Sequence, residues 1–279
     1  MHSNSTPKQT FKELYSTCIG TTKDPRHIAF NNKLADLIGF CQLYDQKMKD
    51  HLGNEIQPIT TAEVSPLNLN DYINLYNNKL LKTEEARKFY DDLLAKGKEI
   101  GCCYCSYGDV EEIDHLLPET RYAQYSIYPK NLIPSCHRCN RKKWGFWPSK
   151  QPDNFIHPYF EDYSNKRWLD AEVIFLTGQP VVRYSISQID FSDASIPIRI
   201  ENQFNRLELG ERYSVQAGRE TRARKQSTFK SLFDNGGKST LVNWLTIEYN
   251  DQFNIDKNSW KTLAYKAFLG SKEFCDFQW

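Results

Sequence analysis

Two Cys-x-x-Cys pairs are the feature that most limits how this 279-residue chain can fold. The pairs are Cys102 with Cys105 and Cys136 with Cys139. Four thiolates in this pattern are typical of a closed, tetrahedral Zn²⁺ site, which orders a small segment by joining two pieces of chain. Chance proximity and a redox site are the alternatives. The thirty residues between the pairs, 106–135, exceed the zinc-ribbon loop of about 15–20 residues, so we expect a further feature inside this loop.

The rest of the sequence favours a reducing compartment for these cysteines. Residues 1–15 lack the apolar segment of a signal peptide, and no apolar run approaches the roughly 18 residues of a membrane span. We therefore expect a cytoplasmic protein with no membrane partner. In the cytoplasm, paired cysteines bind metal more often than they form disulfides.

Charge is distributed unevenly along the chain although the formal net charge is only +1. Residues 130–150 contain six basic residues and no acidic one, and residues 212–230 contain six basic residues against Glu220. Local positive charge of this kind can bind a polyanion despite a neutral total. For 212–230 a solvated helix face is the first interpretation and auxiliary phosphate binding is the alternative.

Hydrophobic periodicity divides the chain into three predicted segments and indicates an α+β fold. Residues 1–98 read as a helical N-terminal segment, with one helix within 28–52 and another that begins at 83–85 and stops at Gly97. Residues 99–150 form a core rich in Cys, aromatic and basic residues. Residues 151–279 form an α+β segment for substrate or partner binding, with strands around a turn in 173–186, a third strand at 196–200, and helices in 207–250 and 256–270.

The loop between the cysteine pairs contains an Asp–His dipeptide, Asp114-His115, and Asn140 follows the last cysteine directly. If zinc brings the second pair against the segment bearing Asp114, then Asp114 and Asn140 can offer oxygen ligands to one hard cation. Mg²⁺ favours such a site, with few protein oxygens, several waters and a substrate phosphate. His115 could then accept a proton from water near neutral pH. A turn cap beside a zinc ribbon is the alternative for this dipeptide.

In combination these residues resemble the HNH, or ββα-metal, endonucleases. The matching positions are Cys102-x-x-Cys105, Asp114-His115, Asn131 and Cys136-x-x-Cys139-Asn140-x-x-Lys143. The chain looks most similar to the zinc-stapled variant whose final His is Asn, as in endonuclease VII-type resolvases. Residues 154–163 and 205–213 also resemble stretches in HNH proteins of bacterial defence loci, including Septu-like and retron-associated ones.

The resemblance implies a ββα-metal core in residues 99–150 and a role for each matching residue. His115 would be the general base, and Asp114 and Asn140 would be ligands of the catalytic cation. Asn131 would fix the loop and orient His115 through the backbone, and Lys143 would contact phosphate, with Lys142 and Arg141 beside it on nucleic acid. The chain departs from the pattern at Trp144, since neither position 140 nor 144 is a histidine. The cation is therefore expected to be Mg²⁺ or Mn²⁺, beside a structural Zn²⁺.

The sequence thus predicts a metal-dependent endonuclease that hydrolyses phosphodiester bonds, most plausibly in DNA, as an effector in antiphage defence. A regulatory partner such as an ATPase or a sensor would restrain it. The alternative is a zinc-stapled nucleic-acid-binding or adaptor protein that never cuts. We expect Trp144, Phe146 and Trp147 to pack against the zinc knuckle, with base stacking as the other interpretation, and we expect His157 to be a core or turn histidine.

Overall fold

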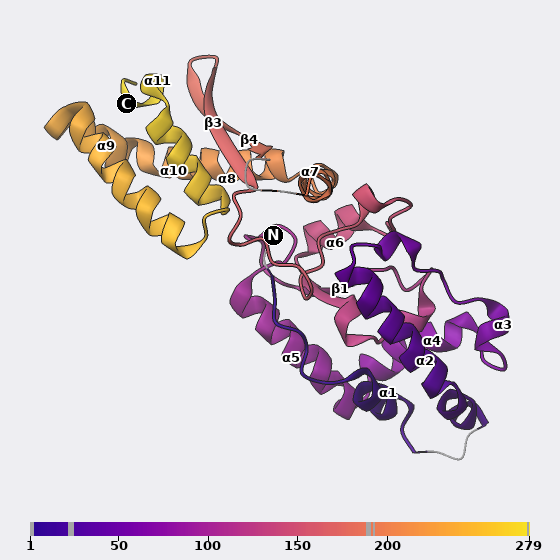
Figure 1. Ribbon diagram of the computed structural model, residues 1–279. Coiled ribbons are helices and arrows are strands. Elements are labelled where there is room, and N and C mark those ends of the chain that lie inside the picture. Colours follow the sequence, from indigo (N-terminus) through magenta and orange to yellow (C-terminus); the bar gives the residue numbers. More distant parts are fainter. Residues whose placement is uncertain (1–2, 22–24, 188–190, 192, 278) are drawn as a thin grey trace. The chain divides into compact units, whose positions relative to one another are not determined.

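The computed structural model describes residues 3–21, 25–187, 191, 193–277 and 279. The chain forms two compact units, residues 1–162 (unit 1) and 163–279 (unit 2) (Figure 1). Unit 1 therefore contains the predicted helical segment, the predicted core and twelve residues that the sequence assigned to the C-terminal segment. Helices and small antiparallel sheets occur together, which confirms the α+β class. In the described part of the chain, every helix is too short or too polar to cross a bilayer.

Helices make up the first hundred residues of unit 1, as predicted. They are α1 (Phe11–Ile19), α2 (Pro25–Lys49), α3 (Thr61–Val64), α4 (Leu69–Asn74) with a π-helical extension η2 (Leu75–Leu80), and α5 (Glu84–Ile100). Capping boxes begin α1, α3 and α4; at α1 the Thr10 side chain accepts from the Glu13 amide while the Glu13 carboxylate accepts from the Thr10 amide. Each box satisfies amides that the first helical turn leaves without partners.

Gly97 lies inside α5 and does not end it, contrary to the prediction. A Cβ at position 97 would approach Cβ of Pro134 to 2.4 Å. The glycine therefore permits close packing of α5 on the second strand of the core. The helix ends instead at Gly101, which has φ +92°, a conformation that glycine adopts without steric cost.

Two short strands and a helix follow α5. The strands β1 (Glu112–His115) and β2 (Leu132–Ser135) pair antiparallel, with Glu112 opposite Ser135 and His115 opposite Leu132. Helix α6 (His137–Lys143) packs against β1, and α5 packs against both strands (Figure 1). Both cysteine pairs flank this arrangement, one after α5 and the other at the start of α6.

Unit 2 combines a long hairpin with helices. Its elements are β3 (Leu169–Leu176), β4 (Gln179–Ile186), α7 (Ser195–Arg206), α8 (Leu209–Arg224), α9 (Lys230–Ile255), α10 (Trp260–Gly270) and α11 (Lys272–Cys275). The hairpin was predicted with a Gly-Gln-Pro turn at 178–180, but it turns at Thr177 and Gly178, both with positive φ. The strand predicted at 196–200 is wrong, because these residues belong to α7. Proline is tolerated in a first helical turn, and Ile200 and Phe204 share the buried face one turn apart.

Candidate active site

Four buried cysteines form the candidate metal centre. Their Sγ atoms lie within 4.8 Å of one another, and those of Cys105 and Cys136 are 3.8 Å apart. Sulfurs about 2.3 Å from a tetrahedral Zn²⁺ are roughly 3.8 Å from each other, so the cluster fits a structural zinc ion. Hydrogen bonds from the other thiols, of which that of Cys102 contributes most, hold the pKa of Cys105 below its usual value. Cys103 lies outside the cluster and its Sγ accepts from Asn4.

The loop that holds the first pair leaves little room around the sulfurs. The Gly108 amide donates to Sγ of Cys105 at 3.4 Å, and a Cβ at position 108 would lie 2.9 Å from Sγ of Cys136. Since real Cβ contacts of that length essentially do not occur, glycine is required where the backbone passes the sulfurs. The close amide also suits a charged thiolate, because N–H groups stabilise anions.

A cavity of about 540 Å³ lies beside the zinc cluster, between β1 and α6. Side chains two apart on a strand share a face, so Glu112 and Asp114 project from the same side of β1. On α6 the spacing of three places His137, Asn140 and Lys143 on one helical face. All five residues line the cavity, as does His115. The structure thus brings together five predicted site residues (Asp114, His115, Asn140, Arg141 and Lys143) and adds Glu112 and His137.

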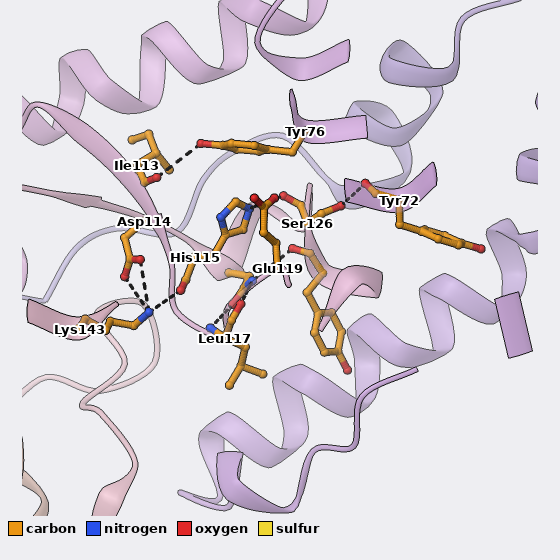
Figure 2. A network of polar contacts seen from close by, with 11 residues as sticks. Tyr72, Tyr76, Ile113, Asp114, His115, Leu117, Glu119, Ser126 and Lys143 are labelled. Carbon is orange, nitrogen blue, oxygen red and sulfur yellow. Dashed lines mark hydrogen bonds and ion pairs between the residues drawn. The ribbon is translucent and has the colours of Figure 1, made fainter. Parts of the chain in front are cut away.

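Asp114 is held by two buried partners. The Lys143 ammonium lies 3.1 Å from Oδ2 and 3.3 Å from Oδ1, and Tyr104 donates its hydroxyl to Oδ2 at 2.6 Å. Burial, more than the nearby carboxylate, raises the pKa of Tyr104 well above its usual value, so this hydroxyl keeps its proton and remains a donor. The carboxylate is therefore neutralised within the protein itself (Figure 2).

Lys143 occupies a different place from the one predicted. Its side chain is only 3% exposed, and its ammonium also donates to the His115 carbonyl at 2.6 Å. In this conformation Lys143 joins β1 to α6 and does not face a phosphate from solvent. Lys142 and Arg141, the other predicted nucleic-acid contacts, are exposed on α6.

Removing one member of the Asp114–Lys143 pair is expected to cost far more stability than removing both. Asp114→Asn leaves a buried ammonium uncompensated, which typically costs about 3–5 kcal/mol, whereas replacing a buried pair by neutral side chains is often tolerated. Urea unfolding of the zinc-loaded protein should therefore show a large loss for Asp114→Asn and recovery in Asp114→Asn/Lys143→Met. Equal stability of wild type and the single variant would contradict the pairing.

His115 is oriented by the loop that follows β1. Its Nε2 lies 2.7 Å from the Ser126 carbonyl oxygen, and a carbonyl only accepts, so Nε2 carries the proton in neutral His115. Nδ1 then keeps its lone pair. The ring packs edge-on against Tyr76, with centroids 4.4 Å apart, and Oε2 of Glu119 lies 3.7 Å from Nε2 (Figure 2). This arrangement provides an imidazole base of fixed tautomer at the edge of the cavity.

Asn131 is fully buried and closes the loop between Leu117 and itself. Its Oδ1 accepts from the Leu117 amide at 2.8 Å, and its Nδ2 donates to the carbonyls of Leu117 at 3.0 Å and Tyr125 at 3.2 Å. The adjacent Ser126 carbonyl is the one that holds His115. Asn131 thus closes the loop whose Ser126 carbonyl contacts His115, and its positioning role stays a prediction.

Behind Asn131 lies a buried chain of hydrogen bonds that the sequence did not predict. The Tyr159 amide donates to Nδ1 of His157 at 3.2 Å, so the proton of the neutral ring sits on Nε2, 3.1 Å from the Tyr44 hydroxyl oxygen. Tyr44 in turn donates to Oδ1 of Asn131 at 3.2 Å. The donor and the acceptor of each hydrogen bond in this chain are therefore determined. His157 is a core histidine, as expected, but it also supports the loop beneath the site.

Acid is expected to destabilise unit 1 through His157. Burial lowers the pKa of this imidazole to about 3, whereas an unfolded histidine has a pKa of about 6.5. Its contribution to stability is fully present above pH about 6.5 and is lost as the pH falls, because the unfolded chain then binds a proton that the folded chain excludes. Between about pH 7.5 and 5.5 this group should lower the free energy of unfolding by about 1 kcal/mol. Urea midpoints of wild type and His157→Gln measure this; identical pH slopes would refute it.

Asn140 and His137 meet Glu112 and not Asp114. Asn140 donates Nδ2 to Oε2 of Glu112 at 2.5 Å, and Nδ1 of His137 lies 2.5 Å from Oε1 of the same carboxylate. This hydrogen bond raises the pKa of His137. Glu112 was missed by sequence reasoning, although its position two residues before Asp114 was the available signal.

Two tryptophans at the end of α6 do not behave alike. Trp144 lines the cavity and is 82% exposed, so the expectation that it packs against the zinc knuckle is wrong. Trp147 is less exposed and lies under the Arg121 guanidinium, 4.0 Å from its ring centroid. Phe146 packs against Phe155 with centroids 5.7 Å apart. An exposed aromatic ring therefore stands at the rim of the cavity.

Two curated proteins are similar to this chain. Protein ea31 of Escherichia phage lambda is 28% identical over 229 residues, 77% of each chain. Septu protein PtuB of Bacillus thuringiensis, a defence-system protein, is 36% identical over 69 residues, which make up 23% of this chain and 26% of PtuB. No family model matches the chain, and no solved structure matches it.

Proposed function

We propose that the chain is a metal-dependent endonuclease with an HNH-type ββα core stapled by zinc. The observation that carries the proposal is the arrangement at the end of β1. There His115, with Nε2 committed to the Ser126 carbonyl, shares a cavity with Asp114, Glu112 and Asn140, and the four clustered cysteines lie after α5 and at the start of α6. These are the parts that the resemblance of the sequence requires.

In this proposal His115 removes a proton from the attacking water through Nδ1, and the loop closed by Asn131 keeps the ring in position. A proton acceptor with a pKa near the working pH suits this task. Oxygen ligands of the cavity, Asp114 and Asn140 in the sequence-based hypothesis, would hold Mg²⁺ or Mn²⁺. When bound, such a cation supplies stabilisation of negative charge on the phosphate and on the leaving oxygen. Lys143 fixes the backbone of β1 at His115.

The proposed substrate is nucleic acid, with DNA as the first candidate. Arg138, Arg141 and Lys142 are exposed along α6, next to the cavity, where they can contact phosphates without sequence preference. Trp144 offers a ring on which a base can stack, an interaction that tolerates any base. Both features support binding of a backbone across the mouth of the cavity.

The proposal is tested with zinc-loaded protein, Mg²⁺ or Mn²⁺, and a panel of supercoiled plasmid, single-stranded DNA and RNA. We expect cation-dependent cleavage that leaves 5′-phosphate and 3′-hydroxyl ends. Mapping the ends identifies both the preferred substrate and the chemistry. Binding to the whole panel without a cut under any cation would support the alternative instead.

The alternative is a zinc-stapled nucleic-acid-binding or adaptor protein, and one observation favours it. Lys143 already neutralises Asp114, so the carboxylate expected to hold the catalytic cation has a cation of its own. A protein of this kind would keep the charged helix and the exposed Trp144 but would not cut. The similarity to Septu protein PtuB supports a role for either function in antiphage defence, with a regulatory partner such as an ATPase or a sensor. A partner that co-purifies with the protein would support this role.

A further inference from the structure

Three carboxylates line the cavity, those of Glu112, Asp114 and Glu119. Glu119 lies beside Nε2 of His115, whereas Glu112 and Asp114 both project from β1 and differ in their surroundings. The side chain of Glu112 is about one-third exposed, at 33%, whereas that of Asp114 is 8% exposed. The partners of Glu112 are an amide and an imidazole. Those of Asp114 are a buried ammonium and a phenol. Of the two carboxylates, only Asp114 has an ammonium as its partner.

The groups around Glu112 form a suitable set of ligands for a divalent cation. A carboxylate and an amide oxygen are the hard ligands that Mg²⁺ and Mn²⁺ prefer, and imidazole is acceptable to Mn²⁺ and softer metals. Asn140 now presents Nδ2 to Glu112, but a half-turn of its amide exchanges the nitrogen for Oδ1. Oxygen and nitrogen of an amide are nearly the same size, so this exchange needs no repacking. His137 lies on the other oxygen of the same carboxylate.

Releasing Asp114 for a cation is much less favourable than recruiting Glu112. Lys143 would have to leave a buried ion pair and the His115 carbonyl, and a buried charge without its partner is strongly destabilising. At Glu112 a cation replaces hydrogen bonds to an amide and an imidazole that border the cavity. The comparison of these two costs selects Glu112.

We propose that Glu112, Asn140 and His137 form the divalent-cation site of this cavity, while Asp114 remains paired with Lys143. This inference rests on the proposed function only in assigning the bound cation to phosphodiester cleavage. It replaces Asp114 by Glu112 as the carboxylate ligand. The ammonium of Lys143 and the bound cation then lie on two neighbouring carboxylates of the same face of β1.

The test measures the binding of Mn²⁺ to the zinc-loaded full-length chain with no nucleic acid present. Electron paramagnetic resonance reports the concentration of free Mn²⁺. Glu112→Gln keeps the shape and a hydrogen-bonding oxygen but removes the charge. Glu111→Gln is the matched control, since Glu111 is the exposed carboxylate directly before β1 and does not line the cavity. We expect Glu112→Gln to weaken Mn²⁺ binding at least about tenfold, because even outer partners of a metal site are worth about 10–100-fold. Glu111→Gln should stay within about twofold of wild type, since it only removes a screened surface charge.

Asp114→Asn/Lys143→Met, which removes the pair together, should bind Mn²⁺ within about threefold of wild type, because the pair carries no net charge. Unchanged binding by Glu112→Gln would overturn the inference, as would loss of binding in the double variant with retention in Glu112→Gln. Melting temperature and zinc content confirm that each variant is folded. Mn²⁺ binding that depends on Glu112, without cleavage of any substrate, would contradict the proposed nuclease function and support the cation site. Cleavage by wild type with unchanged binding in Glu112→Gln would sink the cation site alone.

Discussion

Removal of zinc is expected to unfold unit 1. The ion would join the chain after α5 to the start of α6, and residues of α6 line the cavity. Structural zinc contributes an apparent binding free energy of about 10–16 kcal/mol, as much as the whole stability of an ordinary domain, about 5–15 kcal/mol. A strong chelator should therefore abolish the cooperative thermal transition of this unit, measured by circular dichroism while a dye reports the released zinc.

Two buried cysteines provide matched variants for this prediction. Cys139 belongs to the cluster and Cys103 does not, yet each is at most 2% exposed. Cys139→Ala should lose bound zinc and the transition together. Cys103→Ala should keep the zinc content of wild type. Its free energy of unfolding should fall by about 1–3 kcal/mol, which is typical for truncation of a small buried side chain. Equal zinc content in the two variants would show that the four-cysteine cluster does not bind zinc.

Replacement of His115 is expected to have the largest effect on catalysis. A general base typically contributes about 10²–10⁴-fold to the rate, and Nδ1 of His115 is the base that the hydrogen bond from Nε2 to Ser126 leaves available. Single-turnover cleavage by His115→Ala should fall by about this factor. His27→Ala is the control, because His27 lies outside the cavity and its Nδ1 meets the Ile19 carbonyl.

The rate of His115→Ala is interpretable only if the variant folds. Its melting temperature and zinc content should stay close to those of wild type, since the zinc cluster and the Asp114–Lys143 pair do not need the imidazole. Cleavage at the wild-type rate by folded His115→Ala would exclude His115 as the base. A loss of zinc together with activity would indicate a structural role for this side chain.

The metal centre was predictable because its signal is local and chemically specific. Two Cys-x-x-Cys pairs at this spacing are typical of a metal site, and the four sulfurs do meet. Helices with a clear apolar face, such as α5, were also found, and α5 begins where predicted, but its C-terminal end was wrong. Gly97 looked like a stop because the sequence does not reveal that Pro134 packs against it. At 196–200, alternating isoleucines suggested a strand, whereas the burial of Ile200 and Phe204 one turn apart follows a helix.

The candidate site was predictable in membership and less so in pairing. Asp114, His115 and Asn140 do line one cavity, because α6, which begins at the second cysteine pair, packs against β1. Lys143 stands in a run of basic residues, and nothing in that run distinguishes the one buried ammonium from its exposed neighbours Arg141 and Lys142. Its place depends on the tertiary approach of α6 to Asp114. Glu112 and the chain from His157 to Asn131 depend on contacts of the same long-range kind.

The most direct measurement of the central claim is strand scission across a size-exclusion peak of the zinc-loaded protein with Mg²⁺. Each fraction is assayed for nicking of supercoiled plasmid and for zinc, beside His115→Ala purified in the same way. The account predicts that nicking follows the zinc-containing 32.7 kDa chain and is absent from the His115→Ala fractions. Nicking of equal strength in both preparations, or none from wild type on any nucleic acid, would contradict it.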